Sequence, residues 1–176
     1  MPLFQTVTDL ATDADVIRQR RYGIIECCAG RLKAIRFRPF PKWASLPEAL
    51  FWGERRHRRW QADSCRLYFN QPLRFPSFLA VPYAISGRGT KLATFYAALE
   101  TLDEIARIKR ADAIVADVLN SRISERLLAR QGWSPHKPSR WHRHFIKRFY
   151  GDYPARPRRS SCPSANLSEP PGVLVP

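Results

Sequence analysis

One continuous segment, residues 78–133, constrains the fold more than any other part of the chain. Its hydrophobic pattern changes from a short apolar run to helical spacing in steps of three and four, and then back to a short apolar run. This order predicts a strand, a helix and a second, buried strand, which together make a βαβ unit. We expect a strand at 78–83, a glycine turn at 86–91, a helix from 92 to about 106, a strand at 113–119, and a helix capped by Asn120-Ser121 and stopped by Gly132.

The chain before and after this segment carries shorter patterns. Residues 22–37 alternate around a turn and predict a hairpin, and residues 45–48 have the form of a capping box that opens a helix. Strand-like runs occur at 65–69 and 141–150. Residues 1–19 are weakly patterned and fit either a short strand or a mobile arm.

The composition changes after residue 151, where Pro, Ser and Arg become dominant. A segment this poor in apolar side chains cannot bury a core of its own. The preceding residues are enough for one well-buried core. We therefore expect a single domain over residues 1–151, followed by a disordered tail at 152–176.

The charge balance of the chain is strongly basic. Its 30 Lys and Arg stand against 15 Asp and Glu, a formal charge of +15. Such an excess favours an anionic partner, which can be nucleic acid, an anionic lipid surface or a phosphorylated small molecule. A basic protein without a special partner is the other interpretation. Four arginines near the end of the helix expected after residue 45 either bind nucleic-acid phosphates or form a solvated helix end: Arg55, Arg56, Arg58 and Arg59.

The sequence offers no pattern of a metal site or a membrane span. Its four cysteines include the adjacent Cys27 and Cys28, and none has the spacing of a zinc ligand pair. Adjacent cysteines rarely bridge to each other, so we expect reduced thiols and a cytoplasmic protein. His136, His142 and His144 have no Cys or carboxylate nearby in sequence. No apolar run approaches the length of a transmembrane helix.

Two features of the central segment can carry chemistry. A glycine turn that enters a helix offers free amide N–H groups and the positive end of the helix dipole, an arrangement that binds anions such as pyrophosphate. Glycine turns also precede helices for purely steric reasons. Asp117 lies in an apolar strand, where a carboxylate must be paired or lie at the edge of a site. The residues expected to bind phosphate are Ser86, Gly87, Arg88, Gly89, Thr90 and Lys91.

The order of these pieces is similar to the core of the GNAT N-acyltransferase superfamily. The phosphate motif of that family fits the turn in two registers. Either Gly87 and Gly89 form its G-x-G, with Ala84 where Arg or Gln is usual, or Arg88 supplies the cation and Lys91 stands at the central glycine. The resemblance rests on Ala80-Val81-Pro82-Tyr83, Ser86 to Leu92, Ile114 to Asn120 and Leu127 to Trp133.

The resemblance implies an α/β fold, with a GNAT-like mixed β-sheet flanked by helices, and acyl transfer from acetyl-CoA or another acyl-CoA to an amine. The cofactor would lie along the turn, Asn120 and a splayed strand, where a main-chain N–H near Val81 would hold the thioester. Asp117 is the first candidate for the general base and Tyr83 a candidate for the acid. Leu128 stands where the family often has a Tyr that acts as general acid.

A non-catalytic role is the alternative. In that case a GNAT-like fold would have lost its chemistry, and its basic surface would bind nucleic acid or another anionic partner. The amine acceptor and the acyl group cannot be named from the sequence.

Overall fold

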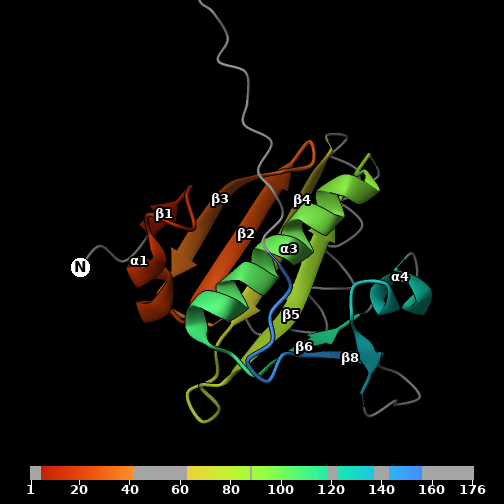
Figure 1. Cartoon of the computed structure of the whole chain (residues 1–176). Helices are drawn as coiled ribbons and strands as arrows, with labels where there is room; N and C mark the ends of the chain where they lie inside the picture. The colour runs from red at the N-terminus through yellow and green to blue at the C-terminus, as the bar shows by residue number, and fades with distance from the viewer. Residues whose placement is uncertain (1–4, 42–62, 88, 119–122, 137–142, 156–176) are drawn as a thin grey trace, which may run out of the picture.

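The computed structural model of the chain describes residues 5–41, 63–87, 89–118, 123–136 and 143–155. Within these residues an eight-stranded sheet carries the long helix α3 across one face (Figure 1). The strands are β1 (Gln5–Val7), β2 (Tyr22–Cys28), β3 (Arg31–Arg38), β4 (Ser64–Asn70), β5 (Phe78–Ser86), β6 (Ala113–Asp117), β7 (Ser134–Pro135) and β8 (His144–Arg148), and the helices are α1 (Ala14–Gln19), α3 (Leu92–Lys109) and α4 (Glu125–Ala129).

The sheet is antiparallel except at one place. Its strand order is β1-β3-β2-β4-β5-β6-β8-β7, and only β5 and β6 pair in parallel among the described strands. A parallel pair needs a crossover connection, which α3 supplies. Residues 78–117 therefore form the βαβ unit expected from the hydrophobic spacing. The predicted α/β class, with a mixed sheet flanked by helices, is confirmed.

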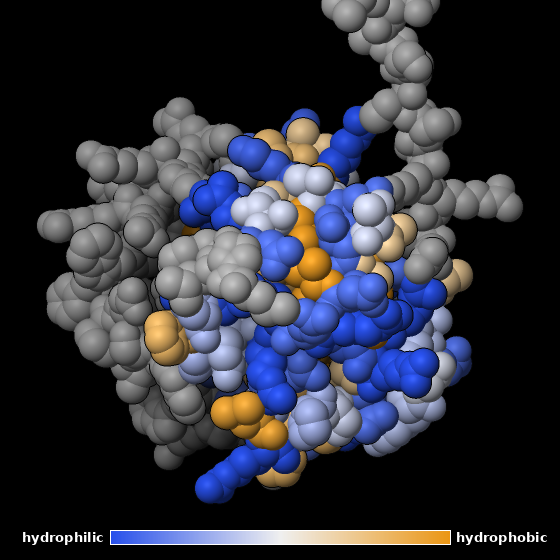
Figure 2. Space-filling model, turned by 90° about the vertical axis from the view of Figure 1, so that its left-hand side faces the viewer, coloured by the Kyte–Doolittle hydropathy of each residue, from blue (hydrophilic) through white to orange (hydrophobic). Residues whose placement is uncertain are grey.

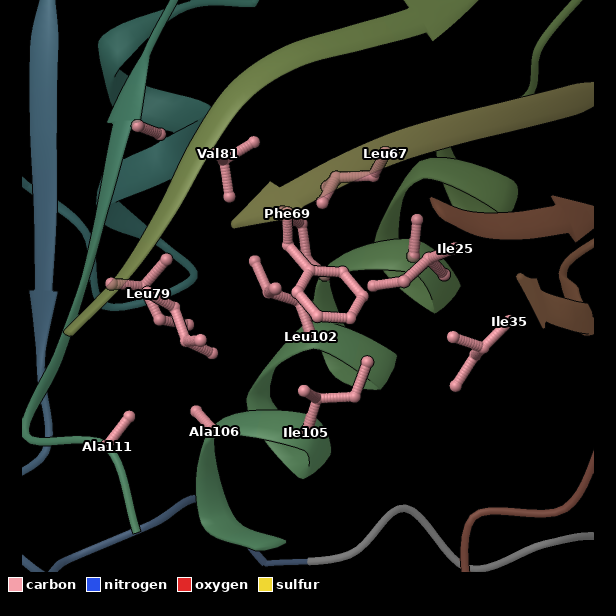
Figure 3. Packing of buried hydrophobic residues seen from close by; sticks show 14 of the residues in the cluster. Ile25, Ile35, Leu67, Phe69, Leu79, Val81, Leu102, Ile105, Ala106 and Ala111 are labelled. Atoms are coloured by element: carbon pink, nitrogen blue, oxygen red, sulfur yellow. The ribbon is translucent and has the colours of Figure 1, made fainter. Parts of the chain in front are cut away.

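The main core lies between α3 and the sheet. Leu102, Ile105 and Ala106 recur at helical spacing and are completely buried, as are Phe69 of β4 and Leu79 of β5. These side chains point toward one another across the interface (Figure 3). Burial of each large apolar side chain favours folding by about 1.5–3 kcal/mol. The apolar periodicity of α3 thus fixes which face of the helix meets the sheet.

One ion pair is enclosed between α3 and β8. The Nζ of Lys147 donates to Oδ2 of Asp103 at 2.7 Å, and these side chains are only 9% and 11% exposed. The Lys147 ammonium also lies 5.7 Å from the ring centroid of Phe149. Burial raises the pKa of the Asp103 carboxyl, and the hydrogen bond from Lys147 acts in the opposite direction. The pair therefore joins helix and sheet with charges rather than with apolar contact.

Strand β5 contains a β-bulge where its pairing with β6 ends. Tyr83 stands opposite Tyr68 of β4, whereas Ala80 stands opposite Asn70, so β5 has one more residue than β4 across this interval. Before the bulge, Val81 belongs to the core under α3. The extra residue inverts the alternation of side chains beyond it. The bulge thus decides which face of the sheet each later β5 residue occupies.

The two parallel strands separate immediately after this bulge. The last parallel partners are Val81 and Ala116, and β5 continues to Ser86 paired with β4 alone among the described strands. Figure 3 shows β5 bending away from β6 beyond Val81. Pro82 has no amide hydrogen and fits a bulge at a strand edge. The edge of β5 that follows is left without a neighbouring strand in the described part of the chain.

Several sequence expectations change at the ends of elements. The weakly patterned N-terminal region contains both β1 and the helix α1. Helix α4 starts later than expected: its cap is Ser124, whose Oγ accepts from the amide of Leu127 at 3.2 Å, rather than Asn120-Ser121. Gly132, with φ of +78°, ends that helical region as predicted.

Contacts with the domain continue slightly past residue 151. The hydroxyl of Tyr153 donates to the carbonyl of Ala111 at 3.0 Å, and its ring stacks on Phe149. The rest of the expected tail, residues 156–176, lies outside the described residues, as does the helix expected after residue 45.

Candidate functional site

The expected phosphate turn joins the free end of β5 to α3. The turn is closed by the amide of Thr90, which donates to the carbonyl of Gly87 at 3.2 Å. The Thr90 hydroxyl donates to the carbonyl of Ser64 at 2.7 Å and ties the turn to β4. Gly87 is buried, whereas Gly89 and Lys91 are exposed. The described residues of the turn are therefore tied to β4, and the exposed Lys91 lies at the start of a long helix.

An acidic side chain from outside the turn caps this helix. The amide of Lys91 donates to Oδ1 of Asp63 at 2.8 Å, and Lys91 itself provides no side-chain cap. The hydroxyl of Thr94 accepts from the amide of Gly30 at 2.8 Å and also bonds to Asp63. Asp63 thus links the β2–β3 turn, the start of β4 and the start of α3. The amides of Leu92 and Ala93 remain as first-turn donors, which have no acceptor within a helix.

Hydrogen bonds to its charged form favour the ionised state of Asp63. The Thr94 hydroxyl and the Lys91 amide lower the pKa of this carboxyl. Because the pKa is lowered on folding, the contribution of Asp63 to stability is present at neutral pH and is lost as the pH falls through the folded-state pKa. Its negative charge lies at the end of the helix where an anionic ligand would bind.

Asp117, the sequence candidate for a base, ends β6 beside the point where the strands separate. Its cross-strand partner is His144 of β8, and the Oδ1 of Asp117 lies 3.8 Å from the Nδ1 of His144. Both side chains are about one-third exposed, at 29% and 35%. Ala116 belongs to the core under α3, so Asp117 occupies the opposite face of the sheet. The structure therefore brings together a carboxylate and an imidazole that the sequence did not connect.

Tyr83 lies on that same opposite face because of the bulge. Its neighbour Ala84 is paired with Leu67, a core residue under α3, whereas Tyr83 is paired with Tyr68. The two phenol rings lie 6.0 Å apart between centroids and are tilted by 54°. Without the extra β5 residue, Tyr83 would follow Val81 toward α3. The bulge thus places Tyr83 and Asp117 on one face, on the two strands that separate.

The same face carries a buried carboxylate that the sequence did not single out. Glu26 of β2 is 6% exposed and is bracketed by two arginines, with Arg66 Nε at 2.8 Å and Arg36 Nη2 at 3.3 Å. Glu26 stands opposite Arg66 in the sheet, so this contact could have been predicted only from cross-strand pairing. That pairing requires the strand order, which a single sequence does not supply.

Leu128 stands where the resemblance to the GNAT superfamily would place a Tyr, and it is 3% exposed and packs within the core. A Tyr hydroxyl there would have to be buried. Six further sequence candidates lie outside the described residues: Arg88, Asn120, Arg55, Arg56, Arg58 and Arg59.

In the described ranges, no three His, Cys, Asp or Glu side chains gather closely enough to hold a metal ion. None of the helices in those ranges is both long and apolar enough to cross a membrane.

Comparison with known proteins does not assign a family to this chain. No family model matches the sequence, and neither does any curated protein. One solved structure, described as the crystal structure of nourseothricin acetyltransferase, is similar over 84% of this chain and 99% of that chain. The identity is 12% and the TM-score is 0.38. A likeness at this level carries no functional argument, so the function must be inferred from the residues of this chain.

Proposed function

We propose that the protein is a CoA-dependent N-acyltransferase. The observation that carries this proposal is the separation of β5 from β6 after Val81, at a bulge, which leaves a β5 edge that no described strand covers and that leads into the turn before α3. A free strand edge offers main-chain donors and acceptors in an extended row, which suits the amide groups of a pantetheine arm. The start of α3 suits the negatively charged pyrophosphate that is attached to such an arm in CoA.

The residues at this end of α3 fit the cofactor in part. Acyl-CoA would supply an activated acyl thioester, and its pyrophosphate needs N–H donors and cations. The amides of Thr90 and Lys91 already have acceptors, Gly87 and Asp63. The remaining donors to the phosphates are the amides of Leu92 and Ala93 and the ammonium of Lys91. Ser86, Gly87 and Gly89 complete the surface, and Arg88 is assigned to it from the sequence alone. Asp63 opposes anion binding by its charge while it positions the helix start.

The face opposite α3 provides the acid–base groups. An ammonium acceptor must lose a proton before it can attack a thioester, and Asp117, with His144 beside it, can take that proton directly or through water. Tyr83 lies on the same face on the other separating strand and is the candidate for protonating the departing thiolate. Leu128 cannot take that role, because it has no ionisable proton and lies in the core.

Cofactor binding is tested by the thermal midpoint of unfolding. A ligand specific for the folded state stabilises it by about 2.7 kcal/mol at a hundredfold excess over its Kd. For a chain of this size that corresponds to a midpoint rise of roughly 5–10 °C with acetyl-CoA. Asp63→Asn should increase the affinity, because it removes a negative charge and keeps an acceptor for the Lys91 amide. The matched control is Asp112→Asn, an exposed aspartate just after α3.

The catalytic assignment is tested separately from binding. With a panel of primary amines, release of the CoA thiol should fall at least about a hundredfold in Asp117→Asn, the scale on which general bases contribute. The acetyl-CoA midpoint shift should remain in that variant. An unchanged midpoint in the wild-type protein at saturating acetyl-CoA would rule out the cofactor. A normal shift with full activity in Asp117→Asn would rule out only the base.

A further inference from the structure

Exposed apolar side chains gather at the end of the sheet that lies away from the candidate site. Leu73 and Phe75 of the β4–β5 loop are 71% and 60% exposed, and Tyr150 after β8 is 76% exposed. The loop precedes Phe78, whose partner Ala113 is paired with Arg148 at the end of β8, so the three side chains leave the same end of the sheet. We call Leu73, Phe75 and Tyr150 the apolar tip.

The β4–β5 loop is held firmly at its base. The buried Gln71 donates through Nε2 to the carbonyl of Pro76 at 2.6 Å, and its amide donates to the carbonyl of Arg21 at 2.8 Å. Lys109 at the end of α3 donates to the Gln71 side chain at 2.9 Å and to the carbonyl of Arg20 at 2.6 Å. The exposed Leu73 and Phe75 are therefore presented by a braced loop, and little further ordering is needed when they bind.

Cations surround the apolar tip. Arg74 lies between Leu73 and Phe75 and is exposed. Further basic residues at this end are Arg110 and Arg148, which are exposed, and Arg20 and Arg21 of the α1–β2 connection, which are half-buried. Exposed acidic residues at this end are Asp112 and Asp152. Figure 2 shows a largely hydrophilic surface on the α1 side, with hydrophobic groups near its centre and near its lower end.

The backbone at Tyr150 supports a role for its exposed ring. Tyr150 has φ of +47°, a left-handed conformation that glycine or asparagine adopts more readily than tyrosine. Its side chain is 76% exposed, so packing does not explain the choice of an aromatic residue. An exposed aromatic ring in a costly backbone conformation points to an external partner.

We propose that this end of the molecule docks on an anionic lipid surface. Leu73 and Phe75 would enter the boundary between headgroups and acyl chains, Tyr150 would lie at the headgroup level, and the arginines would meet the lipid phosphates. Single-stranded nucleic acid is the competing partner, since it also takes arginines with aromatic rings. Leu73 is aliphatic and 71% exposed, which favours lipid, and the ring of Phe75 already makes an edge contact with Phe78.

This docking is independent of the proposed acyl transfer. The apolar tip lies at the C-terminal end of α3, whereas the candidate site lies at the N-terminal end of the same helix. An 18-residue helix spans about 27 Å at 1.5 Å per residue, so the two ends are well separated. Docked in this way, the protein would keep its candidate site in the aqueous phase.

The test is flotation of the full chain with vesicles at about 0.1 M salt, where electrostatic attraction is partly screened. Phosphatidylcholine vesicles with phosphatidylglycerol as about a third of the lipid should bind the protein, and pure phosphatidylcholine vesicles should bind it much less. The double variant Leu73→Ser, Phe75→Ser should bind anionic vesicles at least about tenfold more weakly, because less apolar area leaves water. Arg74→Ser should weaken binding by a smaller factor.

Leu92→Ser is the matched control, because Leu92 is 50% exposed at the opposite end of α3. It should leave vesicle binding unchanged. All variants alter exposed side chains, so their unfolding midpoints should match that of the wild-type protein, which checks that they fold. Absence of binding to anionic vesicles, or equal binding by the double variant, would overturn the proposal. Binding to a single-stranded oligonucleotide in place of vesicles would overturn it in favour of nucleic acid.

Discussion

The two faces of the central sheet differ in chemistry although they share the same strands. In the described part of the chain the face under α3 is mainly apolar, and it includes Lys147 of β8, which pairs with Asp103 of α3. The opposite face carries ionisable and phenolic side chains along neighbouring strands, namely Arg36, Glu26, Arg66, Tyr68, Tyr83, Asp117 and His144. The comparison teaches that one face is packed for stability while the other gathers ionisable and phenolic groups, and that the β5 bulge assigns Tyr83 to the second.

Breaking the ion pair under α3 should have the largest effect on stability. Asp103→Ala leaves the Lys147 ammonium buried without its carboxylate, which costs about 3–5 kcal/mol of unfolding free energy for an enclosed pair. Urea denaturation measures this loss. Glu104→Ala is the matched control on the same helix, because the partner of Glu104, Arg107, has a side chain that is 33% exposed. A loss from Asp103→Ala no larger than the control would mean that water reaches the pair.

The charged cluster of the opposite face should tolerate a change better. Glu26→Gln removes the partner of Arg66 and Arg36, whose side chains are 31% and 55% exposed and can therefore turn to water. We expect a loss of about 1–2 kcal/mol, nearer to a charged hydrogen bond than to a buried pair. The same urea titration tests this ranking. If Glu26→Gln cost more than Asp103→Ala, the division between the two faces would have to be reversed.

Two adjacent cysteines on β2 allow the two faces of the sheet to be compared by thiol reactivity, without any mutation. Cys27 is buried under α3, and burial raises its pKa to about 11, whereas Cys28 is exposed. Cys65, opposite Cys27, has its pKa raised to about 12, chiefly by burial. Thiolates are the reactive form, so iodoacetamide at neutral pH should modify Cys28 well before either buried thiol. Mass spectrometry of peptides gives the order, and equal rates would show that β2 opens readily.

The sequence was sufficient for the βαβ unit because hydrophobic periodicity is a local property. The apolar spacing of α3 and the short runs of β5 and β6 each lie within one segment, and each was found where expected. The helix α1 was not expected, because six residues give too few turns for a periodic signal.

The features of the candidate site that were missed are all non-local. The link from Asp63 to Lys91 joins residues 28 apart, and the Glu26–Arg66 pair depends on a strand order that no local pattern encodes. Pro82 marks a strand edge, but the face of the sheet that Tyr83 occupies depends on one extra residue in β5 relative to β4. The roles assigned to the turn, to Asp117 and to Tyr83 remain predictions.

The hydrogen bond from Lys109 to Arg20 has a consequence for the nascent chain during synthesis. The two residues are 89 positions apart, so the segment of α1 leaves the ribosome long before the lysine that holds its end is made. At about 5–20 residues per second, the delay is roughly 4 to 18 s. During this interval α1 has no α3 to pack against, and a helix of six residues does not persist alone. The α1 segment therefore stays within reach of chaperones and proteases for this interval.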